Sequence, residues 1–154
     1  MMPVFQWLQD TYLAQTIRHS ASLIALLEIV HLIGLTLLIG TILMVDLSLL
    51  GLGIGRHPAA RIGRELNLFT VMGLTIMLVS GPLILCSEAV RCYKTPAFWI
   101  KMVLLAMAIG FHFSIHRRIT REEHPHSRAV AILSLVLWTG VALAGKAIAI
   151  FQPA

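Results

Sequence analysis

Charged residues are scarce in this sequence. Only 12% of its 154 residues are Asp, Glu, Lys or Arg, whereas 58% are hydrophobic and the mean hydropathy is +0.86. An ordinary soluble domain carries about 25% charged residues. The shortage of charge, together with long apolar runs, excludes a typical soluble domain. It predicts an integral membrane protein with a single domain over residues 1–154.

Cysteine is rare as well. The two cysteines, Cys86 and Cys92, exclude a disulfide framework and a cysteine-rich metal site. A disulfide between them and a pair of free thiols both remain open. Residues 1–20 carry Gln6, Gln9 and Asp10 but no basic segment ahead of an apolar core, so we expect no secretory signal peptide.

The net charge of +5 does not indicate a nucleic-acid partner. The basic residues flank apolar runs instead of forming a stripe, and in that position they set membrane topology. We therefore predict a lipid bilayer as the surrounding medium and no contact with nucleic acid.

Four apolar stretches are long enough to cross a bilayer, which takes about 20 residues of helix. We expect the spans at residues 21–50, 66–85, 97–116 and 129–151. Residues 3–19 place Trp7 and Tyr12 opposite polar side chains at helical spacing, which is typical of a helix lying in the membrane interface. The predicted fold class is all-α: an integral membrane four-helix bundle with an N-terminal interfacial amphipathic helix.

Four spans place both termini on one side of the membrane. The basic residues predicted for that side are Arg18, Arg91, Lys94, Lys101 and Lys146. Those predicted for the other side are Arg56, Arg61, Arg64, Arg117, Arg118, Arg121 and Arg128. Because the second set is larger and lies close to helix ends, the positive-inside rule places both termini on the periplasmic side of a bacterial inner membrane.

Ionisable residues interrupt three of the four spans. Glu28 and His31 lie in the first, Lys101 and His112 in the third, and Lys146 in the fourth. Such residues are costly at membrane depth and usually face a bundle interior, a partner or a cofactor. Glu28 and His31 are neighbours on one helical face, and Lys101 and His112 project within about 20° of each other.

The expected depths favour a cofactor pocket between the first and third spans. His31 and His112 bracket the middle of the membrane, and imidazole nitrogen suits the iron of a b-type haem. In this interpretation both histidines are metal ligands, Lys101 or Lys146 lies near the haem propionates, and Glu28 positions His31 or a proton.

Two alternatives use the same residues. The first is a copper or other transition-metal site built from Glu28, His31 and His112. The second is purely structural: a buried Glu–Lys ion pair, with the histidines hydrogen-bonded across helices. Outside this group, Asp46 is expected to cap its helix or pair with a loop arginine, and His116 to be an end residue near the headgroups.

Several short motifs occur in a fixed order along the chain. They are Glu28-x-x-His31-x-x-Gly34, Gly40, Asp46-Leu-Ser-Leu-Leu-Gly51, Thr95-Pro-Ala-Phe98-x-x-Lys101, Trp138 and Gly145-Lys-Ala-Ile-Ala149. In this order the chain resembles an uncharacterised family of four-helix bacterial membrane proteins. More distantly it is similar to the HemJ-type protoporphyrinogen oxidases and to CopD-type copper-resistance membrane domains.

The HemJ-type resemblance implies a haem-binding role for one histidine and matches three further positions. It matches His31 to a haem-binding histidine, Lys101 and His112 to a lysine followed by a histidine in the third helix, and Lys146 to a lysine near the end of the last helix. Ser48 stands where those relatives have an arginine.

Together these observations predict a membrane b-type haem protein that acts in electron transfer or as an oxidase-like redox subunit. A quinone or a porphyrin-type molecule is then its expected small-molecule partner. A haem-free accessory subunit of a larger membrane complex, or one copy in a homo-oligomer, is the second hypothesis. Copper handling is the third, although the methionines are scattered along the helices in the manner of core residues.

Overall fold

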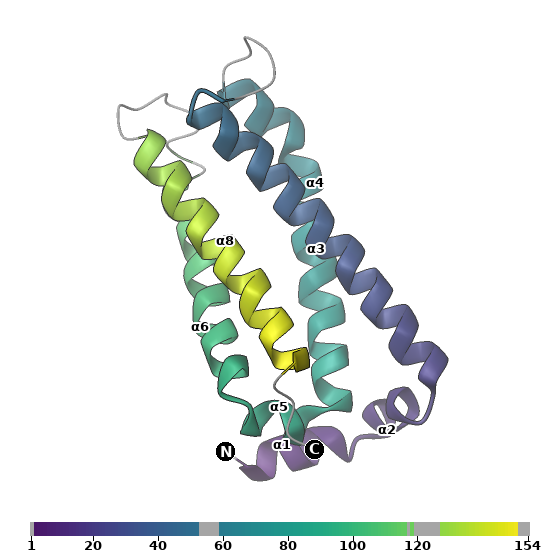
Figure 1. Cartoon of the computed structure of the whole chain (residues 1–154). Coiled ribbons are helices and arrows are strands. Elements are labelled where there is room, and N and C mark those ends of the chain that lie inside the picture. The colour runs from purple at the N-terminus through teal and green to yellow at the C-terminus, as the bar shows by residue number, and fades with distance from the viewer. Residues whose placement is uncertain (1, 53–58, 117, 119–126, 151–154) are drawn as a thin grey trace.

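The computed structural model describes residues 2–52, 59–116, 118 and 127–150, and every regular element in that part is helical. The elements are α1 (Met2–Gln9), α2 (Tyr12–Arg18), α3 (Ala21–Leu49), α4 (Ala59–Ser87), α5 (Ala89–Lys94), α6 (Pro96–Phe111), a π-helical turn (His112–His116) and α8 (Ser127–Ile150). Four long helices form a bundle, and the short helices gather at one end of it (Figure 1). The predicted all-α bundle is confirmed.

Four helices are long and apolar enough to cross a membrane. The candidate spans are Ala21–Leu49, Ala59–Ser87, Pro96–Ser114 and Arg128–Ile148. Most of their surface faces outward and is hydrophobic, which is the arrangement expected of side chains that meet lipid tails. The chain is therefore a multi-pass membrane protein.

The second span begins earlier than the sequence suggested. We expected a start near residue 66, but α4 begins at Ala59, so Arg61 and Arg64 lie in its first turns and not in a loop. Arg61 makes an ion pair with Glu65, one turn further along, with Nε and Oε1 2.8 Å apart. Such a pair stabilises an exposed helix end. Because this first part of α4 is polar, the apolar run in the sequence did not indicate that the helix begins there.

The bundle is assembled from two helix pairs. In the first, α3 and α4 approach closely at Gly34 and Gly73: a Cβ atom on Gly73 would lie 2.8 Å from the backbone nitrogen of Leu38. In the second, α6 packs along α8, and α3 contacts α8 to join the pairs. The core between them consists of Leu38, Ile42, Leu74, Met77, Ala108, Trp138 and Val141.

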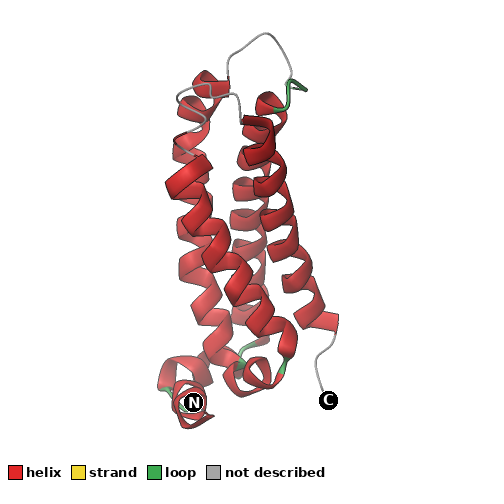
Figure 2. Ribbon diagram, turned by 90° about the vertical axis from the view of Figure 1, so that its left-hand side faces the viewer, coloured by secondary structure: helices red, strands yellow, loops and turns green. Residues whose placement is uncertain are grey.

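The N-terminal segment is two helices and not the single one expected over residues 3–19. The break falls at Asp10 and Thr11. The Thr11 hydroxyl donates to the carbonyl of Leu8 at 2.7 Å and accepts from the backbone N–H of Ala14 at 3.4 Å. One side chain thus ends α1 and caps α2, and the chain turns between them (Figure 2).

Helix α1 docks on the connection between the second and third spans. Phe5 lies among the rings of Tyr93, Phe98 and Trp99, with centroid distances of 4.9 to 6.3 Å. These contacts, and the arrangement in Figure 1, place α1, α2 and α5 at the same end of the bundle as the last turn of α8. The start of α1 and the end of α8 thus lie at one end of the bundle, as an even number of spans requires.

Candidate functional site

Polar side chains enter the bundle at two levels along α3. One group surrounds His31, towards the end that carries α1 and α2, and the other surrounds Asp46, towards the opposite end. Positions 31 and 46 are 15 residues apart, which corresponds to roughly 22 Å of helix. The two groups are therefore separate sites.

At the first level, His31 is held by Ser80 of α4. Nδ1 of the imidazole lies 2.8 Å from the Ser80 hydroxyl oxygen, and that hydroxyl lies 2.6 Å from the carbonyl of Ile76. A serine hydroxyl has one proton, which it donates to Ile76, so it accepts from Nδ1–H of His31. In the neutral ring, Nε2 then carries the lone pair, as it does in histidines that bind metals.

The remaining two helices contribute a cation and a glycine at this level. Lys101 of α6 is half-buried and close enough to His31 for the two to interact electrostatically. A Cβ atom on Gly145 of α8 would lie 3.5 Å from Nζ of Lys101, and one on Gly81 would lie 3.5 Å from Cε1 of His31. The two glycines therefore let the ring edge of His31 and the amino group of Lys101 pack close to the backbones of α4 and α8.

At the second level, Asp46 of α3 bonds to His116 of the π-helical turn. Oδ1 and Nε2 are 2.6 Å apart, and both side chains are almost completely buried. A carboxylate only accepts hydrogen bonds, so the imidazole N–H donates. The ring of His112 stacks on that of His116, with centroids 5.1 Å apart and planes at 24°.

The geometry of α6 explains why His116 reaches the interior. The α-helix ends at Phe111, before the end expected at residue 116, and the next five residues form a π-helical turn. Such turns are rare and occur often at functional sites. His116 was expected near the headgroups, and Asp46 was expected to cap its helix or meet a loop arginine. The expectation for Asp46 is wrong, because its side chain bonds to His116. That His116 lies near the headgroups stays a prediction.

His31 and His112 do not meet. The stacking on His116 places His112 at the level of Asp46, so it lies far along the bundle from His31. Depths estimated from straight helices placed His31 and His112 on either side of the middle of the membrane. Such estimates do not specify which residues of α3 and α6 lie opposite each other.

Glu28 and Lys146 point outward. Both are exposed on the surface of the bundle, and His31 bonds to Ser80 and not to Glu28. This corrects the expected buried cluster of five ionisable residues. A spacing of three residues puts two side chains on neighbouring positions of a helix, but only the packing of α3 against α4 decides which of the two faces inward.

No metal cluster is formed within the part of the chain that the structure describes. No group of three His, Cys, Asp or Glu side chains lies close enough to hold a metal ion there. This speaks against the copper site from Glu28, His31 and His112, because those three residues are not brought together. A haem needs only one protein ligand, so the same finding leaves His31 available for one.

Cys86 and Cys92 are free thiols. Burial raises the pKa of the Cys92 thiol above its ordinary value, and the nearby Glu88 raises it further, against the opposing effect of Lys101 and Arg91. Cys92 is therefore a neutral thiol at neutral pH, which makes it a poor nucleophile and a poor metal ligand.

The sequence pointed to His31 and Lys101 as inward-facing residues. It did not predict the bond between His31 and Ser80 or the bond between Asp46 and His116. A signal for Ser80 exists in principle, since it is a polar residue in an apolar span next to Gly81. His116 lies four residues after His112, a spacing that suggests a shared face. Neither pattern predicts which helix the side chain will contact.

Comparison with known proteins gives a family. A model of a family of unknown function, DUF6644, matches residues 4–151. The chain belongs to this family. No curated protein and no solved structure shows a significant match. The match covers both levels of polar residues, so both belong to the segment that the family model describes.

Proposed function

We propose that this chain is a membrane b-type haem protein, with His31 as the axial ligand, that acts in electron transfer or as an oxidase-like redox subunit. The observation that carries the proposal is the hydrogen-bonded series from Nδ1 of His31 through Ser80 to the carbonyl of Ile76. A histidine that ligates a metal typically donates its other ring N–H to a partner, which fixes its tautomer and orientation.

The residues around His31 fit such a group. The imidazole is half-buried inside the bundle, its ring edge packs beside Gly81, and Lys101 supplies a half-buried amino group close to His31. A haem carries two propionate carboxylates, and an ammonium partly withdrawn from water is stabilised by an anion nearby. Lys101 is therefore the residue we assign to a propionate, while Lys146 points outward.

The position of His112 determines the kind of site. Because it lies at the level of Asp46, it cannot share an iron with His31 in this arrangement of the helices. Of His31, His112 and His116, only His31 would hold a haem at this level. A bound haem supplies one-electron chemistry, and an open position would admit a small reductant of the quinone or porphyrin type. The protein's own contribution is to orient His31 through Ser80 and to place the charge of Lys101.

The test is the reduced-minus-oxidised absorption spectrum of the detergent-purified full chain, together with the haem content after pyridine extraction. We expect a b-type band and near-stoichiometric haem. His31→Ala should abolish haem retention, and Ser80→Ala should weaken it by about 10-fold or more, as loss of an outer partner of a metal ligand does.

Ser87→Ala is the matched control for Ser80→Ala. Ser87 is also buried in α4 and donates to the carbonyl of Ile84 in its own helix, but it does not contact His31. Its substitution should leave haem content unchanged. Full haem content in the His31→Ala protein, or a colourless wild-type protein from haem-replete cells, would refute the proposal.

One observation favours a second candidate, an accessory subunit of a larger membrane complex or of a homo-oligomer. Glu28 lies on the outer surface of α3, among the exposed apolar side chains of Leu26, Ile29 and Leu32. A carboxylate there is roughly 10 Å from the start of the span, and facing lipid is costly. A partner would cover it. Cross-linking in membranes should then yield a cross-linked complex larger than the single chain, and Glu28→Leu should reduce its yield. An unchanged yield in the Glu28→Leu protein would argue against this candidate.

A further inference from the structure

The end of the bundle that carries the short helices contains a pocket of about 340 Å³. It lies between α1, α2, the last turn of α4, and α5, so its walls come from four separate elements. Small-ligand sites usually measure about 300 to 1,000 Å³. This pocket is at the small end of that range and suits a headgroup or a small anion.

The walls of the pocket are positively charged. Arg18 of α2, Arg91 of α5 and Lys94 of α5 face it, and Glu88 is its one carboxylate. Glu88 is engaged with Arg91, at 3.2 Å between oxygen and nitrogen. Arg18 and Lys94 are exposed and make no ion pair within the described residues. An anion in the pocket would therefore meet two cations that no carboxylate of the described chain neutralises.

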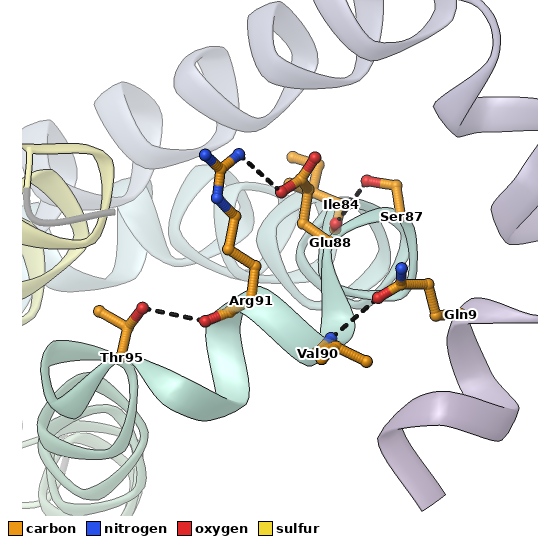
Figure 3. A network of polar contacts seen from close by, with 7 residues as sticks. All are labelled: Gln9, Ile84, Ser87, Glu88, Val90, Arg91 and Thr95. Carbon is orange, nitrogen blue, oxygen red and sulfur yellow. Dashed lines mark hydrogen bonds and ion pairs between the residues drawn. The ribbon is translucent and has the colours of Figure 1, made fainter. Parts of the chain in front are cut away.

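The structure holds these walls in place. Oε1 of Gln9 accepts a hydrogen bond from the backbone N–H of Val90 at 3.0 Å, which ties α1 to α5, as Figure 3 shows. At the end of α5, the hydroxyl of the capping residue Thr95 donates to the carbonyl of Arg91 at 3.0 Å (Figure 3). The pocket is thus formed by the docking of the interfacial helices and is not a gap between side chains on a single helix.

The depth of the pocket points to a lipid. Helices α1, α2 and α5 lie outside the four candidate spans but immediately beside their ends. Trp7 and Tyr12 are 68% and 89% exposed on α1 and α2, and such aromatic residues favour the level of the headgroups. Basic residues close to the membrane surface attract anionic lipid headgroups electrostatically.

We propose that this pocket binds the phosphate of an anionic phospholipid headgroup, held by Arg18 and Lys94, with Arg91 oriented by Glu88 at its edge. The proposal is independent of any haem at His31, because the pocket lies at the membrane surface and shares no residue with that site.

The test measures binding of phosphatidylglycerol and phosphatidylcholine to the delipidated full chain in detergent, by native mass spectrometry and by the shift in unfolding temperature. We expect phosphatidylglycerol to bind more tightly than phosphatidylcholine. Arg18→Gln with Lys94→Gln should weaken phosphatidylglycerol binding by about 30-fold, the loss expected for two cations at an anionic headgroup.

The control removes two charges elsewhere. Arg61 and Arg64 are exposed in the first turns of α4, at the opposite end of the bundle. Arg61→Gln with Arg64→Gln should leave phosphatidylglycerol binding unchanged, and Arg18→Lys with Lys94→Arg should retain most of it. Circular dichroism shows whether each variant is folded.

Two results would overturn the proposal. Equal losses in the pocket variant and the control variant would mean that lipid binds through overall charge and not in the pocket. Displacement of phosphatidylglycerol by millimolar inorganic phosphate, with the same stabilisation by phosphate alone, would mean that the pocket takes a free anion and not a lipid.

Discussion

The carboxylate of Asp46 is completely buried in a helix that crosses the membrane, and its Oδ1 lies 2.6 Å from Nε2 of His116. Among the described residues, its second oxygen has no hydrogen-bond partner. A buried polar group without its partner costs more than the bond itself contributes. The pair is therefore expected to be important for stability, whatever its role in function.

We predict strong coupling between these two side chains. In a double-mutant cycle with Asp46→Ala and His116→Ala, each single change should lower the free energy of unfolding by about 2 to 4 kcal/mol, because each leaves a buried polar partner. The coupling energy should be about 1 to 3 kcal/mol. Reversible unfolding in mixed micelles measures both quantities.

The exposed ion pair between Arg61 and Glu65 provides the reference for that cycle. Its atoms are 2.8 Å apart, but both side chains are more than half exposed. Exposed pairs at this helical spacing contribute about 0.3 to 0.5 kcal/mol. A coupling for Asp46 and His116 as small as this reference would show that their contact does not stabilise the bundle.

At the scale of helices, α3 and α4 approach each other closely at Gly34 and Gly73. Gly73 faces the backbone of Leu38 and Gly34, so a side chain at position 73 has no space. Small residues at such crossings let two membrane helices approach and gain van der Waals contact, since lipid supplies no hydrophobic drive between them. This crossing also positions Ser80 opposite His31.

Gly73→Ala should destabilise the fold by about 1 to 3 kcal/mol, as overpacking does. Gly40→Ala is the matched change on α3, where a Cβ would meet nothing within 4 Å. That change should be neutral or stabilising by up to about 1 kcal/mol, because alanine favours helix. Thermal unfolding in detergent compares the two proteins. Equal stabilities would contradict the close crossing.

The four spanning helices were predictable, whereas their ends and the number of short helices were not. Long apolar runs specify spans regardless of context, whereas α4 begins at Ala59 in a stretch with three arginines and a glutamate, where hydropathy gives no signal. The break at Thr11 and the π-helical turn at His112–His116 depend on single hydrogen bonds and on neighbouring helices.

At the scale of the whole molecule, four spans place the first and last described residues at one end. The excess of arginine near the other end leads us to propose that this other end faces the cytoplasm, with both termini periplasmic. Several arginines in that count, among them Arg56, Arg117 and Arg121, lie outside the described residues.

Cysteine labelling tests this orientation. In a protein with Cys86→Ala and Cys92→Ala, we introduce Gln15→Cys on α2 or Arg61→Cys on α4, both exposed positions at opposite ends of the bundle. A membrane-impermeant maleimide applied to intact spheroplasts should label position 15 and reach position 61 only after permeabilisation. The reverse pattern would place the termini inside, and labelling of both without permeabilisation would contradict a membrane crossing by α3.

By itself the sequence determined the membrane class, the four spans and the presence of ionisable residues within them, because these follow from the cost of exposing charge and backbone to lipid. Only the tertiary structure decided that His31 and Lys101 face the interior, that Glu28 and Lys146 face outward, and that Asp46 meets His116. The physical reason is that helical periodicity places residues on faces, while the rotation and offset of each helix arise from side-chain packing against its neighbours.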